Sequence, residues 1–215
     1  MDDNIVKEKV MNSIRNALLN KDEFINNKKQ DPNIDYNKPM KEEPEIEFVQ
    51  QFIDNGGKFV FCDNINDLFN KLNAAKNTYN WDAIFCNNKK IGEILNRAGI
   101  IYKFDITEQN SIPFAFVPCE LMIARSGSVL FTLFSEKETQ LLTTSETLIV
   151  IVRIDKIVPD IKDATNYLKD IYINSLPPTV TILNGPAKTN SIENKFIVGG
   201  QGPKELFLFL VNDKF

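Results

Sequence analysis

Hydrophobic positions between residues 45 and 99 alternate between helical spacing and short continuous apolar runs. Runs such as KFVFC and DAIFC have the length and apolar content of buried strands. Asn64 is a suitable N-cap for one helical stripe, Asn55-Gly56-Gly57 ends another, and Gly99 ends a third. The predicted helical faces are Ile46, Val49, Phe52 and Ile53, then Ile65, Leu68, Phe69 and Leu72, then Ile91, Ile94, Leu95 and Ala98; the predicted strands are 58–62 and 81–86.

The second half of the chain is richer in strand-like runs. Residues 112–117, 129–133 and 147–152 are apolar enough to be buried on both faces of a sheet. Residues 160–173 have the spacing of a crossover helix, with Ile161, Ala164, Leu168 and Ile171 directed inward. Two further strands, 179–183 and 205–211, are expected to close the sheet. Strands that alternate with helices through short links predict an α/β fold, with a mostly parallel sheet covered by helices on both faces in three layers.

The chain before residue 45 has a different character. Val6, Val10, Met11, Ile14, Ala17 and Leu18 predict an N-terminal helix with one apolar face. Residues 20–44 are rich in Asn, Lys, Asp and Glu and contain three prolines, which indicates an irregular connection. A partner-binding arm is the alternative interpretation. We therefore expect an N-terminal helix and arm over 1–44 and an α/β domain over 45–215.

Length and charge limit the possible classes of protein. A chain of 215 residues with 43% apolar residues can form one domain with a substantial core. The net charge of −4 and a pI near 5.1 provide no cationic excess for non-specific binding to nucleic acid or to an anionic membrane. Apolar runs such as TLIVIV are far shorter than the ~20 residues of a membrane-spanning helix. The start MDDNIVKEKV lacks a signal-peptide pattern, so a cytoplasmic protein is expected.

The absence of histidine excludes several kinds of chemistry. A Ser-His-Asp triad, a His-assisted cysteine nucleophile and a His-ligated metal all require a residue that this chain lacks. The three cysteines, at 62, 86 and 119, form no CxxC pair, so no metal site or iron–sulfur cluster is expected within the chain itself. Cys62 and Cys86 lie in apolar runs, where a buried and inert thiol is expected. The odd count indicates a reducing compartment.

Five of the nine glycines fall in three short turns beside predicted strands: Gly127, Gly185, Gly199, Gly200 and Gly202. Ligands bind at strand ends in open α/β sheets, and glycine there lets backbone N–H groups approach an anion. Plain tight turns are the alternative. In the first turn, Arg125 lies between Ala124 and Ser126-Gly127-Ser128, where a guanidinium and two hydroxyls can receive a carboxylate or phosphate. An Arg paired with a structural carboxylate is an equally good interpretation.

The second turn, Gly185-Pro186-Ala187-Lys188-Thr189, lacks the Walker A spacing and is therefore not a P-loop. A helix that begins at Thr189, Asn190 or Ser191 is the physical alternative, and its N-terminus would attract anions. In the third turn, three glycines surround Gln201 and leave a backbone that a ligand can approach closely, although a bulge between strands is the structural alternative. Glu120 and Glu193 are the only candidates that we single out for acid–base or nucleophilic chemistry.

In this order, the stretches ARSGSVLF (124–131), GPAKTNSIE (185–193) and GGQGPKELFLFLV (199–211) resemble the LUD-domain family, whose members include lactate-utilisation protein C. The resemblance implies a layered α/β fold similar to the sugar-phosphate isomerase and CoA-transferase group, with the N-terminal helix as an extension. It also implies a role in the oxidation of L-lactate to pyruvate as one component of a three-protein system. The iron–sulfur clusters of that system belong to the other two components.

The chain departs from the family pattern at four positions: Ser128 replaces a threonine and keeps the hydroxyl, Ala187 replaces a serine, Ser191 an aspartate and Gln201 a histidine. Gln201 keeps hydrogen bonding but removes proton transfer near neutral pH. The leading hypothesis is an accessory component that docks with iron–sulfur partners. Its candidate residues for a small carboxylate or phosphate are Arg125, Ser126, Gly127, Ser128, Gly185, Lys188, Thr189, Gly200, Gln201 and Gly202. A stand-alone isomerase, acyl transferase or ligase and a degenerate binding module are the alternatives.

Overall fold

The computed structural model describes residues 42–105, 112–173, 175–190, 196–198 and 202–212. The predicted N-terminal helix and most of the irregular arm lie outside these ranges. The first described helix is α3, which starts at Pro44. None of the helices in the described ranges is long and apolar enough to cross a membrane.

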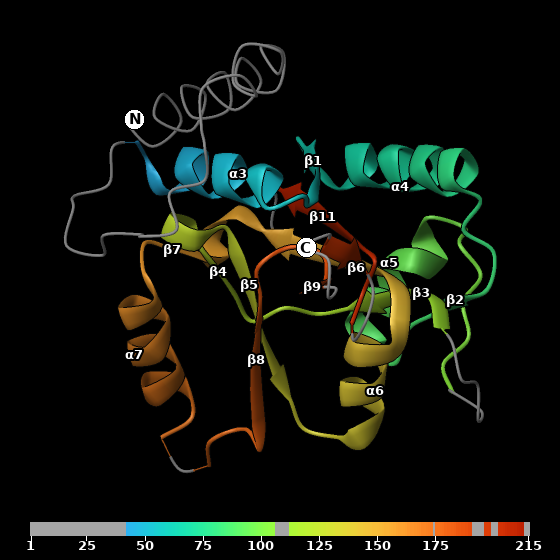
Figure 1. The fold of residues 1–215 in the computed structure, drawn as a ribbon. Coiled ribbons are helices and arrows are strands. Elements are labelled where there is room, and N and C mark those ends of the chain that lie inside the picture. Colours follow the sequence, from blue (N-terminus) through green and yellow to red (C-terminus); the bar gives the residue numbers. More distant parts are fainter. Residues whose placement is uncertain (1–41, 106–111, 174, 191–195, 199–201, 213–215) are drawn as a thin grey trace.

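The main sheet contains five parallel strands in the order β1-β11-β6-β3-β2 (Figure 1). Their bounds are β1 Lys58–Cys62, β11 Glu205–Val211, β6 Ser145–Arg153, β3 Ile112–Val117 and β2 Ile84–Phe85. The predicted strand over 81–86 is therefore much shorter than expected. β11 was expected to close the sheet, but it lies in the sheet's interior between β1 and β6. Its apolar sequence suits that position, because an interior strand is covered on both faces.

Helices cover both faces of the main sheet, as the sequence predicts. The helices α4 (Ile65–Tyr79) and α5 (Lys89–Arg97) pack on one face, and α3 (Pro44–Asp54) and α6 (Glu136–Thr144) pack on the other. Successive side chains of β11 alternate between the two cores: Leu206, Leu208 and Leu210 face α3 and α6, and Phe207, Phe209 and Val211 face α4 and α5.

The predicted helix boundaries agree with the structure in the first half of the domain. Asn64 caps α4, and its side chain accepts hydrogen bonds from the backbone N–H groups of Asn66 and Asp67. The helix α3 ends at Asp54, and its C-cap, Asn55, directly precedes Gly56-Gly57. A Cβ at Gly57 would lie 2.3 Å from the Phe52 ring, so the chain can turn closely over α3 only with glycine at this position.

A second sheet corrects the expectation of a single sheet. Its order is β7-β4-β5-β8, with bounds β7 Ile157–Val158, β4 Leu121–Ile123, β5 Ser128–Leu133 and β8 Thr179–Leu183. The pairs β4–β5 and β5–β8 are antiparallel, so the predicted strands 129–133 and 179–183 do not belong to the parallel sheet. The inner face of this sheet packs against the main sheet through Met122, Val129 and Phe131. An apolar pattern shows that a strand is buried but does not identify the strand that it pairs with.

The predicted crossover helix is α7 (Ile161–Ile171), and it covers the outer face of the second sheet. Ala164 and Leu168 are buried there as expected, but Ile161 and Ile171 are 46% and 56% exposed. Two of the four residues that we expected to face inward are therefore exposed. The reason is that α7 lies on a small sheet of short strands, and only the middle of the helix is covered.

Candidate functional site

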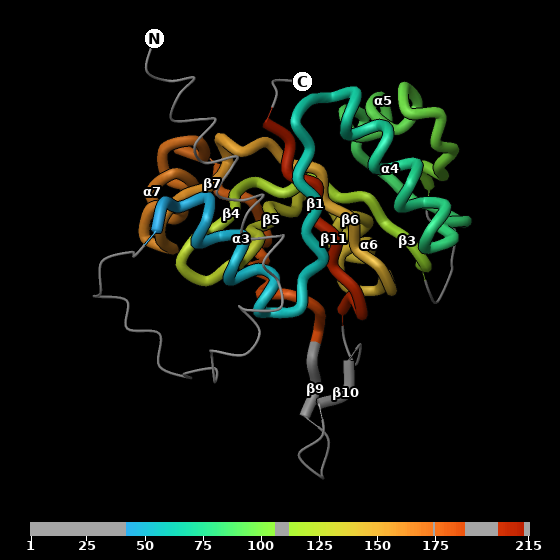
Figure 2. Tube along the Cα trace, turned by 90° about the horizontal axis from the view of Figure 1, so that it is seen from above, coloured from blue at the N-terminus to red at the C-terminus, as the bar shows by residue number. Residues whose placement is uncertain are grey.

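The described parts of the glycine turns lie toward the amino end of the main sheet, where β1 and β11 begin side by side (Figure 2). Gly56-Gly57 directly precedes β1, and Gly202-Pro203 directly precedes β11, its parallel neighbour. The backbone N–H of Ala187 donates to the carbonyl of Pro203 at 2.8 Å, which joins the second turn to the third. Open α/β sheets usually bind ligands at the carboxyl ends of their strands. The glycine turns of this chain lie at the opposite end of the sheet.

Four polar side chains join the first turn to the second and to the end of α3. Asn55 Nδ2 donates to the carbonyl of Ser126 at 2.8 Å and to Asn184 Oδ1 at 2.6 Å. Ser128 Oγ donates to the same Asn184 oxygen at 3.3 Å, and it lies 2.7 Å from Ser126 Oγ. We call Asn55, Ser126, Ser128, Asn184 and Gly185 the turn cluster. Residues far apart in the sequence thus form one hydrogen-bonded group.

Close packing accounts for glycine at two positions of these turns. Gly127 has a φ of 61°, and a Cβ there would lie 2.3 Å from the backbone nitrogen of Phe52. Gly185 has a φ of 90°, and its Cβ would lie 2.5 Å from the carbonyl oxygen of Asn55. In both cases the neighbour is backbone at the end of α3, which cannot rotate away as a side chain can. Gly127 and Gly185 are therefore required by the fold, whether or not an anion binds nearby.

The Asn184 side chain carries a hydrogen-bond donor besides the oxygen that joins the turn cluster. Its carbonyl oxygen accepts from Asn55 and Ser128, and the residue as a whole is exposed. Since the oxygen and the NH₂ group of a planar amide point in different directions, the NH₂ group is turned away from the turn cluster. A carboxylate or phosphate oxygen can accept from it. The turn cluster therefore offers the NH₂ group of Asn184 as a donor, on an amide that Asn55 and Ser128 hold in place.

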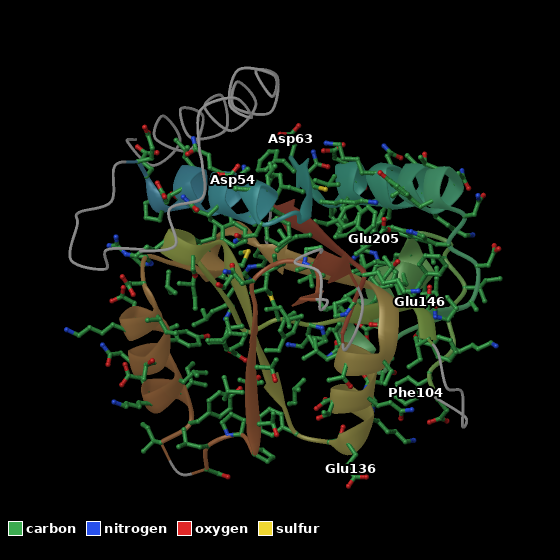
Figure 3. The ribbon with its side chains drawn as sticks, in the orientation of Figure 1. Asp54, Asp63, Phe104, Glu136, Glu146 and Glu205 are labelled. Carbon is green, nitrogen blue, oxygen red and sulfur yellow. The ribbon has the colours of Figure 1, made fainter. Side chains whose placement is uncertain are left out.

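Two ion pairs flank the amino end of the sheet beside these turns. Lys58 Nζ lies 2.6 Å from Glu205 Oε1, and Lys204 Nζ lies 3.3 Å from Glu146 Oε2. Figure 3 labels both glutamates, which lie at the starts of β11 and β6. Each pair is formally neutral, so these four residues add no net charge to the site. An anion here would depend mainly on hydrogen-bond donors.

Arg125 takes the structural role that the sequence left as an equal alternative. Its Nε donates to Asp160 Oδ2 at 2.6 Å, and both side chains are largely buried, at 16% and 20% exposure. The backbone N–H of Arg125 also donates to the carbonyl of Pro159 at 3.1 Å. Asp160 is the N-cap of α7. The pair therefore ties the first glycine turn to the start of α7.

The second turn does not lead into a helix over the described residues. Lys188–Asn190 forms the strand β9, which pairs antiparallel with β10 (Phe196–Val198). A helix that starts with Thr189 as its cap is therefore wrong, because Asn190 is extended and paired in a hairpin. A cap at Asn190 stays a prediction, since the residues that would follow it lie outside the described ranges. The strand β10 precedes the third turn. Ser191, the other candidate cap, lies outside the described residues, as do Glu193, Gly200 and Gln201.

Gly202 is described, and the Ala187 N–H bond to Pro203 brings it beside the second turn. A Cβ at Gly202 would lie 3.1 Å from Ala187 Cβ. The structure thus brings together five of the ten candidate ligand residues, namely Ser126, Gly127, Ser128, Gly185 and Gly202. The side chain of Lys188, another candidate, is not among those described.

Glu120 lies in a separate polar group at the other end of β4 from the first turn. Its Oε2 accepts from Thr132 Oγ1 and from Tyr172 OH, each at 3.1 Å. Burial of the Tyr172 hydroxyl raises its pKa, and the Glu120 charge raises it further. Lys156 Nζ donates to Tyr167 OH at 2.7 Å on the same side of the second sheet. Glu120 is therefore held by neutral hydroxyls and does not belong to the turn cluster.

The cysteines are placed as inert thiols. Cys62 and Cys86 lie in the core beneath α4 and α5, and Cys119 packs against the opposite core. Burial raises the pKa of Cys62 and Cys119 to about 12 and that of Cys86 to about 11. With pKa values this high, the three thiols are protonated and unreactive at neutral pH. Within the described ranges, no three His, Cys, Asp or Glu side chains are grouped to hold a metal ion.

The residues that the sequence reasoning missed are Asn55 and Asn184. Both directly precede a glycine with positive φ, Gly56 and Gly185. An Asn-Gly pair at the end of a helix or strand is a recognised turn signal. That signal identifies the turns, but only the fold shows that the two asparagine side chains meet.

Comparisons with known proteins agree with the layout of the chain. The family model of the LUD domain matches residues 46–211, a segment that contains the whole turn cluster. The chain is also similar to a solved structure, a DUF162 family protein from Deinococcus radiodurans. The two share 15% sequence identity with a TM-score of 0.55, over 81% of this chain and 100% of that chain. At this identity the similarity shows the fold alone. No curated protein matches.

Proposed function

Because the chain belongs to the LUD-domain family, which is associated with lactate utilisation, we propose that it is an accessory component of a multi-protein system that oxidises L-lactate to pyruvate. In this proposal the electrons pass to iron–sulfur clusters held by partner proteins. The present chain docks with those partners and holds a small carboxylate at the turn cluster.

One observation carries the proposal: the family match spans all the segments that build the turn cluster. Asn55, Ser126, Ser128 and Asn184 come from four separate parts of residues 46–211, and the fold joins them by hydrogen bonds. The outward NH₂ group of Asn184 and the two serine hydroxyls suit the oxygen atoms of a carboxylate or phosphate. A small carboxylate is the ligand that agrees with the family's association.

The state of the cysteines supports the assignment of the clusters to partners. Cys62 and Cys86 are buried and Cys119 is half-buried, and burial raises the pKa of all three thiols. Iron–sulfur clusters are usually held by four cysteine thiolates. The three cysteines of this chain are too few for such a site, which supports clusters held by partner proteins.

The partner part of the proposal is tested by anaerobic affinity purification of the tagged chain from lactate-grown source cells. Mass spectrometry of the retained proteins is expected to find two iron–sulfur proteins in constant proportion. A parallel deletion of the gene is expected to impair growth on lactate and to leave growth on glucose unchanged. A chain purified without partners, together with normal growth on lactate, would overturn this part.

The ligand part is tested by calorimetric titration of the full chain with L-lactate, pyruvate and inorganic phosphate. The informative variant is Asn184→Asp, because a carboxylate still accepts from Asn55 and Ser128 but replaces the outward donor with a negative charge. We expect it to weaken binding by about tenfold or more, since an interaction of ~1.4 kcal/mol corresponds to that factor. Asn166→Asp, on the exposed side of α7, is the control with the same charge change.

The two variants distinguish loss of a contact at the turn cluster from the effect of one added negative charge on the protein. Equal binding by the wild type, Asn184→Asp and Asn166→Asp would place the ligand elsewhere. No heat of binding with any of the three anions would remove the ligand from the proposal while the partner experiment stands on its own.

A further inference from the structure

The strand β8 forms an open edge of the second sheet. It pairs antiparallel with β5 on one side, and among the described strands it has no partner on the other (Figure 1). Its sequence, TVTIL, contains two β-branched threonines, a valine and an isoleucine and has no charge. Natural edge strands usually carry charges, prolines or bulges that prevent pairing with another chain. Within β8 itself we find no such protection.

The outward apolar face of the second sheet continues onto β8. Ile182 pairs with Leu130 and Val180 with Thr132, so both β8 side chains share the face that α7 covers over β4. The cover does not extend to β8, where Val180 and Ile182 are 43% and 40% exposed. Leu176, four residues before Val180, is 65% exposed. This edge therefore exposes apolar surface together with unpaired backbone groups.

The charge pattern around β8 indicates what can cover it. Residues 171–187 contain no charged residue, although 25% of the whole chain is charged. A two-fold contact places a segment against its own copy, so any charge near the axis would face an identical charge. A neutral segment avoids that repulsion in a protein whose net charge is −4. A charged partner protein would bind better to a segment of opposite charge than to a neutral one. The neutral segment therefore favours a second copy of this chain as the partner.

Space is available for a strand beside this edge. A groove of about 460 Å³ lies between the start of β8, at Pro178 and Thr179, and the side of α6 that carries Thr139 and Thr143. An incoming strand along β8 would pass over this groove. Pro177 and Pro178 lack backbone N–H groups and would limit the pairing to β8 itself.

We propose that two copies of this chain associate by antiparallel pairing of β8 with β8 around a two-fold axis at Thr181. In this register Val180 of one copy lies opposite Ile182 of the other, and the reverse pair repeats the contact. Pairs of β-branched side chains are favourable cross-strand neighbours. The dimer joins the two four-stranded sheets into one sheet of eight strands. The contact is small, so a dissociation constant on the order of 10 µM is expected.

The register also connects the dimer to the turn cluster. With the two-fold axis at Thr181, a residue three positions before it in one copy lies opposite the residue three positions after it in the other. Pro178 of the second copy therefore lies opposite Asn184. The rim of each candidate ligand site then includes the start of β8 from the other copy. The dimer itself does not depend on the proposed ligand, and the experiment below uses none.

The test uses the full chain in sedimentation-velocity experiments over a range of concentrations. Val180→Lys/Ile182→Lys places like charges opposite each other in this register and is expected to weaken the dimer by about tenfold or more. Val180→Lys/Ile182→Glu changes the same two exposed positions but places Lys opposite Glu, and is expected to restore association. Circular dichroism shows whether each variant is folded.

Three outcomes would overturn the proposal. The wild type could remain monomeric up to about 100 µM, well above the expected dissociation constant. The double-lysine variant could dimerise as strongly as the wild type, which would locate the interface elsewhere. The Lys/Glu variant could be as monomeric as the double-lysine variant, which would exclude this register. Concentration-dependent protection of β8 amides from hydrogen exchange would support the pairing independently.

Discussion

The close approach of Gly127 to α3 gives a prediction that can be worked through from the structure. An alanine at this position adds a Cβ 2.3 Å from the backbone nitrogen of Phe52 and 2.4 Å from the carbonyl carbon of Gln51. The backbone φ of 61° adds a second penalty, because residues with a Cβ rarely adopt this conformation. Gly127→Ala therefore strains the backbone and forces the first turn away from α3.

Gly99→Ala separates the two penalties. Gly99 has a similar φ of 71°, but a Cβ there would have no atom within 4 Å. Backbone strain alone is expected to lower the free energy of unfolding by about 1 kcal/mol at Gly99. Overpacking against backbone adds about 2 kcal/mol at Gly127, for a total loss of ~3 kcal/mol. That loss is a substantial part of the stability of an ordinary domain.

Urea unfolding followed by tryptophan fluorescence measures both losses. Trp81 is the only tryptophan and is 1% exposed, so its emission reports the loss of the core. Asparagine variants at the two positions extend the test, since asparagine tolerates positive φ but still carries a Cβ. Gly99→Asn is expected to be nearly neutral and Gly127→Asn to remain destabilised. Equal losses at the two positions would refute the packing argument and reopen a ligand-based reason for glycine at 127.

Three further predictions concern charged and titratable groups. Arg125→Ala is expected to lower the unfolding free energy by about 2 kcal/mol, because it leaves the largely buried Asp160 carboxylate without its guanidinium; chemical unfolding measures this loss. Stability is expected to fall as pH rises from about 9 toward 11, since the buried thiols keep raised pKa values only in the folded state, and iodoacetamide labelling should be slow until the chain unfolds. Glu120→Gln is expected to lower the pKa of Tyr172, measured by NMR titration, and loss of any turnover in this variant would favour the stand-alone enzyme.

Most of the first half of the fold could be predicted because its signals are local. Asn64 caps α4, and Gly56-Gly57 follows the end of α3. The apolar residues of each predicted helix or strand have one regular spacing. These elements can therefore be predicted from residues close in sequence. The family resemblance is confirmed by the LUD-domain match over 46–211. The helix α6 was missed although its start is readable, since Ser135 and Glu138 form a capping box.

The division into two sheets could not be predicted in the same way. The run 129–133 is as apolar as the run 147–152, yet it pairs with β4 and β8 and not with the parallel strands. Burial on both faces explains the similarity: β5 lies between α7 on one side and the main core on the other. Strand partners are set by contacts between distant segments, and a hydrophobic pattern contains no record of them.

In the candidate site, some residues are required for the fold and a neighbouring residue is available to contact a ligand. The sequence directed attention to the glycines, and the structure explains Gly127 and Gly185 by their contact with the end of α3. Substitutions at these two positions will therefore change binding by disturbing the fold. Asn184 differs, because its oxygen holds the cluster together while its NH₂ group points in another direction on an exposed residue. Only a change that keeps the oxygen and alters the nitrogen, such as Asn184→Asp, can test recognition without unfolding the site.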